Sequence, residues 1–202
     1  MSFMEKNEIR KLIKTRLSSP VVPLEKQSLI VKEKICNFSE YKNASLIFAY
    51  MALPDELDLT PLIEQAFKDG KKVYIPRIIS GTSDMDFYEA GSAVSKGSFG
   101  ILEPEPTEEK RFKKEEISSY ENKSLVLVPG RAFTKGGGRV GRGKGFYDKY
   151  LRIMKDTCPF KEHLFFAGVC FSEQILEEGD IVLSSYDIPM DFLFFALSGV
   201  DF

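Results

Sequence analysis

Residues 125–151 read LVLVPGRAFTKGGGRVGRGKGFYDKYL, and this segment carries the strongest structural signals in the chain. Its first four residues form an apolar run of the length expected for a buried strand. At its other end, the spacing of the apolar residues from Phe146 to Met154 predicts a helix with one apolar face. Six glycines lie in between at residues 136–145, interleaved with or next to the cations Lys135, Arg139, Arg142 and Lys144. The segment therefore predicts a strand, a basic glycine-rich loop and a helix, in that order.

This loop has the chemistry of a phosphate-binding site. Glycine adopts backbone conformations closed to other residues and lets a ligand approach the main chain closely. The N-terminus of the following helix adds bare N–H groups with partial positive charge, and the four cations add more. The alternative is a flexible surface linker made soluble by its charges. A linker has no need of four cations among its glycines, so we favour the phosphate site.

Two named phosphate motifs nearly match the loop. Residues 138–144 have the spacing of a P-loop, but Gly145 stands where a Ser or Thr hydroxyl would hold magnesium. Residues 136–141 satisfy the dinucleotide pattern GxGxxG, yet they begin well after the strand ends. No acidic residue follows at the spacing needed to bind a ribose hydroxyl. The sequence thus argues against an ordinary P-loop NTPase and gives little support to dinucleotide binding.

The composition restricts the class of protein. A chain of 202 residues suits one domain, covering 1–202, and its net charge of −2 does not indicate a nucleic-acid partner. No apolar run has the length of a membrane helix, and the N-terminus lacks a signal core. Three cysteines without CxxC spacing indicate free thiols, so we expect a cytoplasmic protein. The only histidine, His163, is expected at the edge of a strand.

The remaining elements predict an α/β fold with three layers, α/β/α, around a mainly parallel, Rossmann-like sheet. The helices are expected at residues 5–17 and 24–38, and from Thr60 as N-cap to Gly70. The strands are expected at 44–50, 71–76, 85–88 and 192–197, and from residues 125 and 164 onward. Ligands bind beyond the carboxyl ends of such strands. That rule selects residues 51–56, residues 76–77 and the glycine-rich loop.

The loop also resembles the signature of a known family. The patterns PGxAF at residues 129–133 and GxRxGxGxGxYD at 137–148 are similar to those of 5-formyltetrahydrofolate cyclo-ligases, also called methenyltetrahydrofolate synthetases. The N-terminal KxxIR at 6–10, residues 98–104, Gln174, and the pair Asp187 and Asp191 also resemble family segments. One position departs from the pattern: Thr134 stands where the family usually has Asp. Threonine can make a weaker version of the local turn bond that Asp would make.

The resemblance implies an enzyme that uses ATP and Mg²⁺ to convert 5-formyltetrahydrofolate into 5,10-methenyltetrahydrofolate, releasing ADP and phosphate. The γ-phosphoryl group would be transferred to the formyl oxygen, which is otherwise a poor leaving group. Phosphoryl transfer depends on positioning and charge neutralisation more than on a covalent nucleophile. The basic glycine-rich loop suits that task. Its partners would be ATP and a reduced folate, with no nucleic acid or membrane, and we expect a monomer.

The resemblance also implies roles for individual residues. Catalytic roles fall to Arg142 and Lys144. The ATP site would include Lys6, Asn7, Glu8, Ile9, Arg10, Arg139, Val140, Gly141, Arg142, Gly143, Lys144, Gly145, Phe146 and Tyr147. The folate site would include Met51, Glu56, Arg142, Gly143, Lys144, Gly145 and Phe146, with Glu56 accepting pterin N–H groups. Magnesium would be held by Asp148 and Asp187.

Several of these residues also have plain structural interpretations. Lys6 and Arg10 lie four apart on one solvated helix face, Glu56 and Asp148 are acids favoured near helix N-termini, and Asp187 is a common turn residue. Two other functions remain open. One is a sugar-phosphate isomerase or kinase, which needs a general base that His163 is poorly placed to supply. The other is a non-catalytic sensor of a nucleotide or phosphorylated metabolite. Whether Glu103 and Gln174 contact a ligand is left open.

Overall fold

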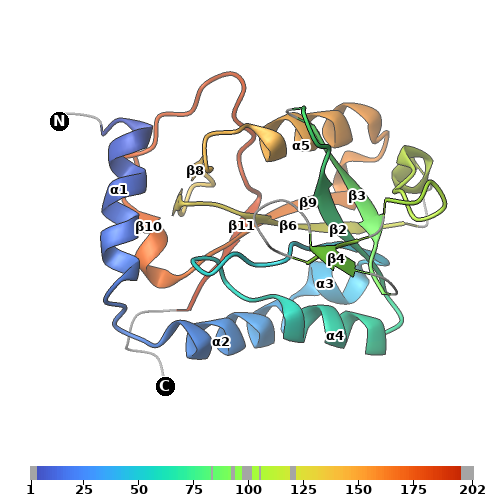
Figure 1. The fold of residues 1–202 in the computed structure, drawn as a ribbon, viewed down its shortest axis with the longest axis horizontal. Coiled ribbons are helices and arrows are strands. Elements are labelled where there is room, and N and C mark those ends of the chain that lie inside the picture. The colour runs from blue at the N-terminus through green and yellow to red at the C-terminus, as the bar shows by residue number, and fades with distance from the viewer. Residues whose placement is uncertain are drawn as a thin grey trace.

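The computed structural model of the chain describes residues 4–82, 84–91, 94–96, 102–104, 106–118 and 122–196. A central sheet separates two layers of helices (Figure 1). In spatial order its strands are β11 (Phe192–Phe194), β9 (Leu164–Val169), β6 (Ser124–Pro129), β1 (Leu46–Phe48), β2 (Lys72–Ile78) and β3 (Met85–Glu89). All neighbours run parallel except β2 and β3. The predicted α/β fold with a mainly parallel sheet is confirmed.

The buried central strands explain the continuous apolar runs in the sequence. Leu125 and Leu127 pack on one face of the sheet, against helices α2 and α4. Val126 and Val128 pack on the other, against helix α5. Because alternate residues of a strand point to opposite faces, both faces of β6 must be apolar when both are covered. The helices are α2 (Leu24–Asn37), α4 (Thr60–Lys68), α5 (Phe146–Thr157) and the short α3 (Ser39–Asn43).

Helix α1 (Lys6–Leu17) belongs to neither of these layers. It lies at the end of the molecule beside a second, small sheet with the order β10-β7-β8 (Figure 1). Ile9 and Ile13 of α1 pack in one buried cluster with Ala132 and Val140 of the small sheet. The small sheet consists of β10 (Ile175–Leu176), β7 (Ala132–Thr134) and β8 (Arg139–Val140). This docking brings α1 to the glycine-rich segment.

The other described elements are short. A two-stranded sheet pairs β4 (Val94–Lys96) with β5 (Leu102–Pro104), and three 3₁₀ turns are η2 (Lys114–Ser118), η3 (Lys161–His163) and η4 (Ser172–Gln174). Of the family-like segment 98–104, residues 98–101 lie outside the described residues, and of Glu103 only the backbone position on β5 is described. No helix in the described part of the chain is both long and apolar enough to span a membrane.

Several predicted boundaries need correction. Thr60 is the first residue of α4 and not its N-cap; the carboxylate of Asp58 caps the helix by accepting hydrogen bonds from the Thr60 N–H and hydroxyl, at 2.9 and 2.7 Å. Gly70 does end the helix as predicted, with φ of 71°. Its N–H donates to Phe67 O, and the next N–H, of Lys71, donates to Ala66 O, as in a Schellman motif.

The strands also differ in length from their predictions. The strand expected at 44–50 is regular only over Leu46–Phe48. β2 runs on to Ile78, so Pro76 and Arg77 lie within a strand, paired with Phe87 and Asp86 of β3, and not after its end. Pro76 is tolerated because β1 pairs only with Lys72–Tyr74, which leaves the proline beyond that ladder. β11 is regular over Phe192–Phe194, and residue 197 lies outside the described part.

Candidate functional site

The glycine-rich segment consists of two parts with different backbone structure. The first part is a hairpin, in which β7 and β8 run antiparallel. Gly137 N–H donates to Thr134 O at 3.0 Å, and the Thr134 hydroxyl accepts from Gly138 N–H at 3.1 Å. This is the local turn bond expected of Thr134 in place of Asp. The first part of the loop predicted between strand and helix, residues 132–140, is therefore a hydrogen-bonded hairpin.

The hairpin turn is fixed against the chain that precedes β11. Gly137 O accepts a hydrogen bond of 2.9 Å from Met190 N–H. Gly137 has a φ of 90°, and a Cβ on this residue would lie 2.3 Å from Met190 O. No side chain fits at such a distance from another backbone, so glycine is required here.

The second part, residues 141–145, is open. Among the described hydrogen bonds, none uses a backbone N–H of these five residues. Gly143 and Gly145 have φ of 95° and 71°, and Gly145 is the N-cap of α5. Free amides therefore lead directly into the N-terminus of a 12-residue helix, an arrangement that attracts anions. The positive φ also accounts for Gly145 in the position where a P-loop has Ser or Thr.

A cavity of 490 Å³ lies along this open segment. All five residues 141–145 line it, together with residues at or near the ends of strands β1, β2 and β6. The predicted site residues among its lining are Lys6, Arg10, Met51, Glu56, Arg139, Gly141, Arg142, Gly143, Lys144, Gly145, Phe146, Tyr147, Asp148 and Asp187. The structure thus brings residues from four distant parts of the sequence to one cavity, at the edge of the sheet where strand-end reasoning placed a ligand.

Four predicted ATP residues do not line this cavity. Ile9 and Val140 are buried between α1 and the small sheet. Asn7 Oδ1 accepts a 2.6 Å hydrogen bond from Arg10 Nη1, and Glu8 accepts one of 2.9 Å from Glu5 N–H in a capping box. These residues hold α1 and Arg10 in place, and a direct role for them in ATP binding stays a prediction.

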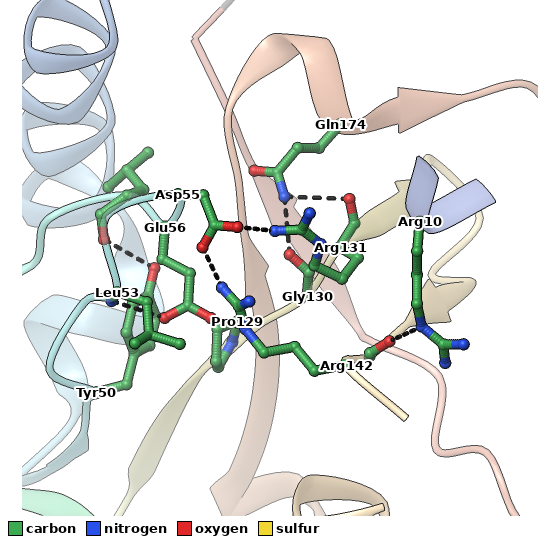
Figure 2. Close-up of polar contacts among 12 residues, drawn as sticks. Arg10, Tyr50, Leu53, Asp55, Glu56, Pro129, Gly130, Arg131, Arg142 and Gln174 are labelled. Carbon is green, nitrogen blue, oxygen red and sulfur yellow. Dashed lines mark hydrogen bonds and ion pairs between the residues drawn. The ribbon is translucent and has the colours of Figure 1, made fainter. Parts of the chain in front are cut away.

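Arg10 connects α1 to the open segment. Its Nε donates to Gly141 O at 2.9 Å, and a Cβ on Gly143 would lie 3.2 Å from its Nη2. Figure 2 shows Arg10 on one side of this segment, while the Arg142 side chain extends to the other. The guanidinium of Arg10 therefore lies against the same backbone whose amides are free.

An ion-pair network joins the open segment to the loop after β1. Arg142 contacts the carboxylates of both Asp55 and Glu56, the latter at 2.8 Å from Nε to Oε1. Asp55 also contacts Arg131, so that its carboxylate bridges two guanidinium groups (Figure 2). Burial alone would raise the pKa of Asp55, but Arg142 and Arg131 outweigh burial and hold that pKa below its usual value. Asp55 is therefore ionised as part of the network at neutral pH.

Arg131 anchors this network from within the protein. The Arg131 side chain is only 9% exposed, and the Arg131 backbone N–H donates a hydrogen bond to Val140 O. Gln174 is buried beside it and donates from Nε2 to Gly130 O and Arg131 O at 2.8 and 3.2 Å. The question left open for Gln174 has a structural answer, because its amide holds loop backbone and does not line the cavity.

The two predicted magnesium ligands both lie at the cavity, and each is paired with a cation. Asp187 accepts from Lys6 Nζ, and Asp148 Oδ1 accepts from Arg139 Nη2 at 2.6 Å and from Ile188 N–H at 3.4 Å. Burial would raise the pKa of Asp187, but Lys6 and the Ser184 N–H and hydroxyl lower it overall. No cluster of three metal-binding side chains occurs within the described ranges. Two carboxylates at one cavity fit magnesium, which is commonly held by one or two carboxylates together with substrate phosphates.

The cavity lining also contains apolar and aromatic residues. They include Tyr50, Leu53, Ile78, Met85 and Pro129. Leu53 lies in the segment 51–56 that the strand-end rule selected and Pro129 in the PGxAF pattern, but none of the five was named as a site residue from the sequence. Tyr50 and Pro129 lie at the carboxyl ends of their strands, so the strand-end rule, applied residue by residue, would have found them. The Tyr147 hydroxyl is buried and has no hydrogen-bond partner among the described residues.

These features define an α/β protein with a cavity at the carboxyl edge of its sheet, lined by cations, by apolar groups and by the open segment 141–145. Comparison with known proteins gives the family. The model of the 5-formyltetrahydrofolate cyclo-ligase family matches residues 3–195. The chain belongs to that family.

Its relatives agree with this assignment. A probable 5-formyltetrahydrofolate cyclo-ligase of Schizosaccharomyces pombe is 30% identical over 198 residues, which cover 94% of each chain. A 5-formyltetrahydrofolate cyclo-ligase of Mus musculus is 30% identical over 171 residues, covering 82% of this chain and 80% of the mouse protein. The NMR structure of Aquifex aeolicus 5,10-methenyltetrahydrofolate synthetase has a TM-score of 0.73 and 28% identity, covering 95% of this chain and 89% of its own.

Proposed function

We propose that this protein converts 5-formyltetrahydrofolate to 5,10-methenyltetrahydrofolate with ATP and Mg²⁺, releasing ADP and phosphate. The open segment 141–145 is the observation that carries the proposal. The five backbone N–H groups of this segment have no hydrogen-bond partner among the described residues, and the segment leads into helix α5. Its residues line the cavity together with Lys6 and Arg10. That arrangement suits a polyphosphate whose charge must be neutralised during transfer.

The cavity lining offers groups suited to each substrate. Its cations suit the phosphates of ATP. Its apolar residues, which include Met51, Ile78 and Phe146, suit the flat pterin ring. The Glu56 side chain is 9% exposed, and its carboxylate can accept pterin N–H groups. The formyl oxygen would then point toward the open segment, where Arg142 and Lys144 lie.

The chemistry proceeds in two steps. The formyl oxygen takes the γ-phosphoryl group from ATP, and the bond to the β-phosphate oxygen breaks to give ADP. N10 then attacks the activated formyl carbon, loses its proton, and expels phosphate as the carbon–oxygen bond breaks. Arg142 and Lys144 neutralise charge on the transferring group, and the free amides orient it. Asp148 and Asp187 would hold magnesium together with the phosphates, and the ion would supply further neutralisation of charge.

The two competing functions fit the structure less well. A sugar-phosphate isomerase needs a general base, but His163 lies immediately before Leu164, the first residue of β9, at the opposite end of that strand from the cavity edge. A sensor needs phosphate affinity but not the apolar residues of the lining. We propose further that the protein acts as a monomer in the cytoplasm, where its three free cysteines would stay reduced.

The test is a direct assay of product formation. Purified protein is mixed with 5-formyltetrahydrofolate, ATP and Mg²⁺, and methenyltetrahydrofolate is followed by its near-ultraviolet absorbance. We expect product only when all three are present, with one ADP released for each product formed. ATP binding without product would favour the sensor, and no ATP binding would refute the assignment of the open segment. Light scattering of the active sample gives the oligomeric state.

A further inference from the structure

Asp55 contacts two arginines that differ in their access to the cavity. Arg142 lines the cavity, whereas neither Asp55 nor Arg131 does. The Arg142 side chain is 38% exposed and that of Arg131 only 9%. One carboxylate therefore joins a partly exposed cation at the site to a buried cation inside the protein (Figure 2).

The same network includes Arg142, which is expected to contact the transferred phosphoryl group, and Glu56, which is expected to bind the pterin. Arg142 donates from Nε to Glu56 Oε1 and from Nη2 to Asp55. The second oxygen of Glu56 already accepts a 3.0 Å hydrogen bond from Leu53 N–H. For Arg142 to turn fully to a phosphoryl oxygen it must give up these carboxylates. For Glu56 to accept a pterin N–H it must release or share the oxygen that Arg142 holds.

We propose that Asp55 is a positioning residue that couples the ATP and folate sites by holding Arg142 against Glu56 in the free protein. This inference rests on the function proposed above. Either substrate shifts the equilibrium toward the open network, and the other then binds without having to break it. Because coupling between two sites is reciprocal, each substrate should tighten the binding of the other by the same factor.

Arg131 keeps the Asp55 carboxylate paired when the network opens. Removing the only cation beside a partly buried carboxylate costs free energy, because the carboxylate is then left unpaired. When Arg142 leaves, Asp55 still has Arg131, whose backbone is held by Val140 and Gln174. The carboxylate thus remains paired in both states, and only Arg142 changes partners.

The test measures the affinity of the magnesium complex of AMP-PNP, an ATP analogue that is not cleaved, with and without saturating 5-formyltetrahydrofolate. In the wild type we expect the folate to lower the Kd of AMP-PNP about fivefold or more. Asp55→Asn removes one of the two carboxylates that hold Arg142 and leaves only Glu56, so AMP-PNP alone should bind several-fold more tightly than to the wild type, and the effect of folate should fall below about twofold. kcat should change little compared with KM, since Arg142 and Lys144 are retained.

Controls separate coupling from damage to the fold. Asp84→Asn removes an exposed carboxylate paired with Lys149 outside the cavity lining, and should leave both Kd values and their ratio unchanged. If Asp55→Asn does not fold because Arg131 is left unpaired, the double variant Arg131→Met, Asp55→Asn removes both charges and still frees Arg142 from Asp55. Weaker or unchanged binding of AMP-PNP alone in the folded variant would overturn the proposal.

The proposed function is checked independently by turnover of the wild type. A wild type that forms methenyltetrahydrofolate but shows equal AMP-PNP affinity with and without folate refutes the coupling and leaves the function standing. A wild type that forms none refutes the function. The affinity of Asp55→Asn for AMP-PNP alone still tests, in that case, whether Asp55 restrains Arg142.

Discussion

Lys6 and Asp187 form an ion pair across 181 residues of sequence, with Lys6 Nζ at 2.9 and 2.8 Å from the two carboxylate oxygens. The pair joins the start of α1 to the chain that leads into β11, at the rim of the cavity. A residue predicted to bind ATP thus neutralises, in the free protein, a residue predicted to bind magnesium. When ATP and its metal ion bind together, the phosphates would take the place of Asp187 beside Lys6. The metal ion would take the place of Lys6 beside Asp187.

Lys144→Ala should lower turnover about 100-fold or more, because Lys144 would neutralise charge mainly in the transition state. Lys144 lies in the open segment, lines the cavity, and has no ion pair among the described residues, so the fold should survive its loss. Steady-state product formation measures the effect. Lys135→Ala, which removes an exposed cation of the same glycine-rich segment outside the cavity lining, serves as the matched control. Near-normal turnover of Lys144→Ala would remove this residue from the mechanism.

Lys6→Met and Arg10→Met should each weaken ATP binding about tenfold while changing folate binding little, since both cations line the cavity and would pair with the phosphates. Calorimetric titration of each ligand separately gives the two affinities. Lys11→Met, on the exposed face of the same helix, should change neither. A wild-type Kd for ATP in Lys6→Met and Arg10→Met would restore the interpretation of these residues as a solvated helix face.

Asp148→Asn and Asp187→Asn should both reduce activity, and raised magnesium should restore part of it, because asparagine keeps the size of the side chain but not its charge. If the two carboxylates share one ion, the losses should be less than additive in the double variant. Magnesium titrations of turnover measure this. Wild-type magnesium dependence in Asp187→Asn would leave Asp187 as the partner of Lys6 alone.

The lowered pKa of Asp187 predicts a dependence of stability on pH. Because the pKa is lower in the folded than in the unfolded protein, the ionised carboxylate stabilises the fold above the unfolded value of about 3.9. That contribution disappears as the pH falls through the folded pKa. Urea unfolding at pH 6 and pH 3 should therefore show a larger difference between wild type and Asp187→Asn at pH 6. Equal differences in the free energy of unfolding at pH 6 and pH 3 would show that Lys6 does not lower the pKa of Asp187.

The sequence was sufficient for the main elements and for most of the cavity. Long apolar runs such as Leu125–Val128 and the periodic face of α5 specify their structure locally. The strand-end rule then placed Met51, Glu56 and the glycine-rich segment at one edge of the sheet. These inferences succeed because they rest on short-range patterns and on a general property of parallel sheets.

The sequence was not sufficient for the small sheet or for the ion pairs. β8 has only two residues, Arg139 and Val140, which are too few to show the alternation of apolar and polar residues that predicts a strand. The ATP motif was predicted as one continuous range that includes Val140, and the sequence did not show that this residue packs in the buried cluster with α1. Asp55 lies 76 and 87 residues from its two arginines, and such pairs are determined by tertiary structure alone.

The division of the glycine-rich segment has a consequence for hydrogen exchange. In the hairpin part, the amides of Gly137 and Gly138 are bonded, and Met190 N–H is bonded to the hairpin turn. These protons should exchange slowly with deuterium, whereas those of residues 141–145 should exchange almost at the rate of an unstructured peptide. A bound polyphosphate would slow the second group and leave the first unchanged. A few adjacent amides therefore contain both an internal standard and a direct reporter of occupancy.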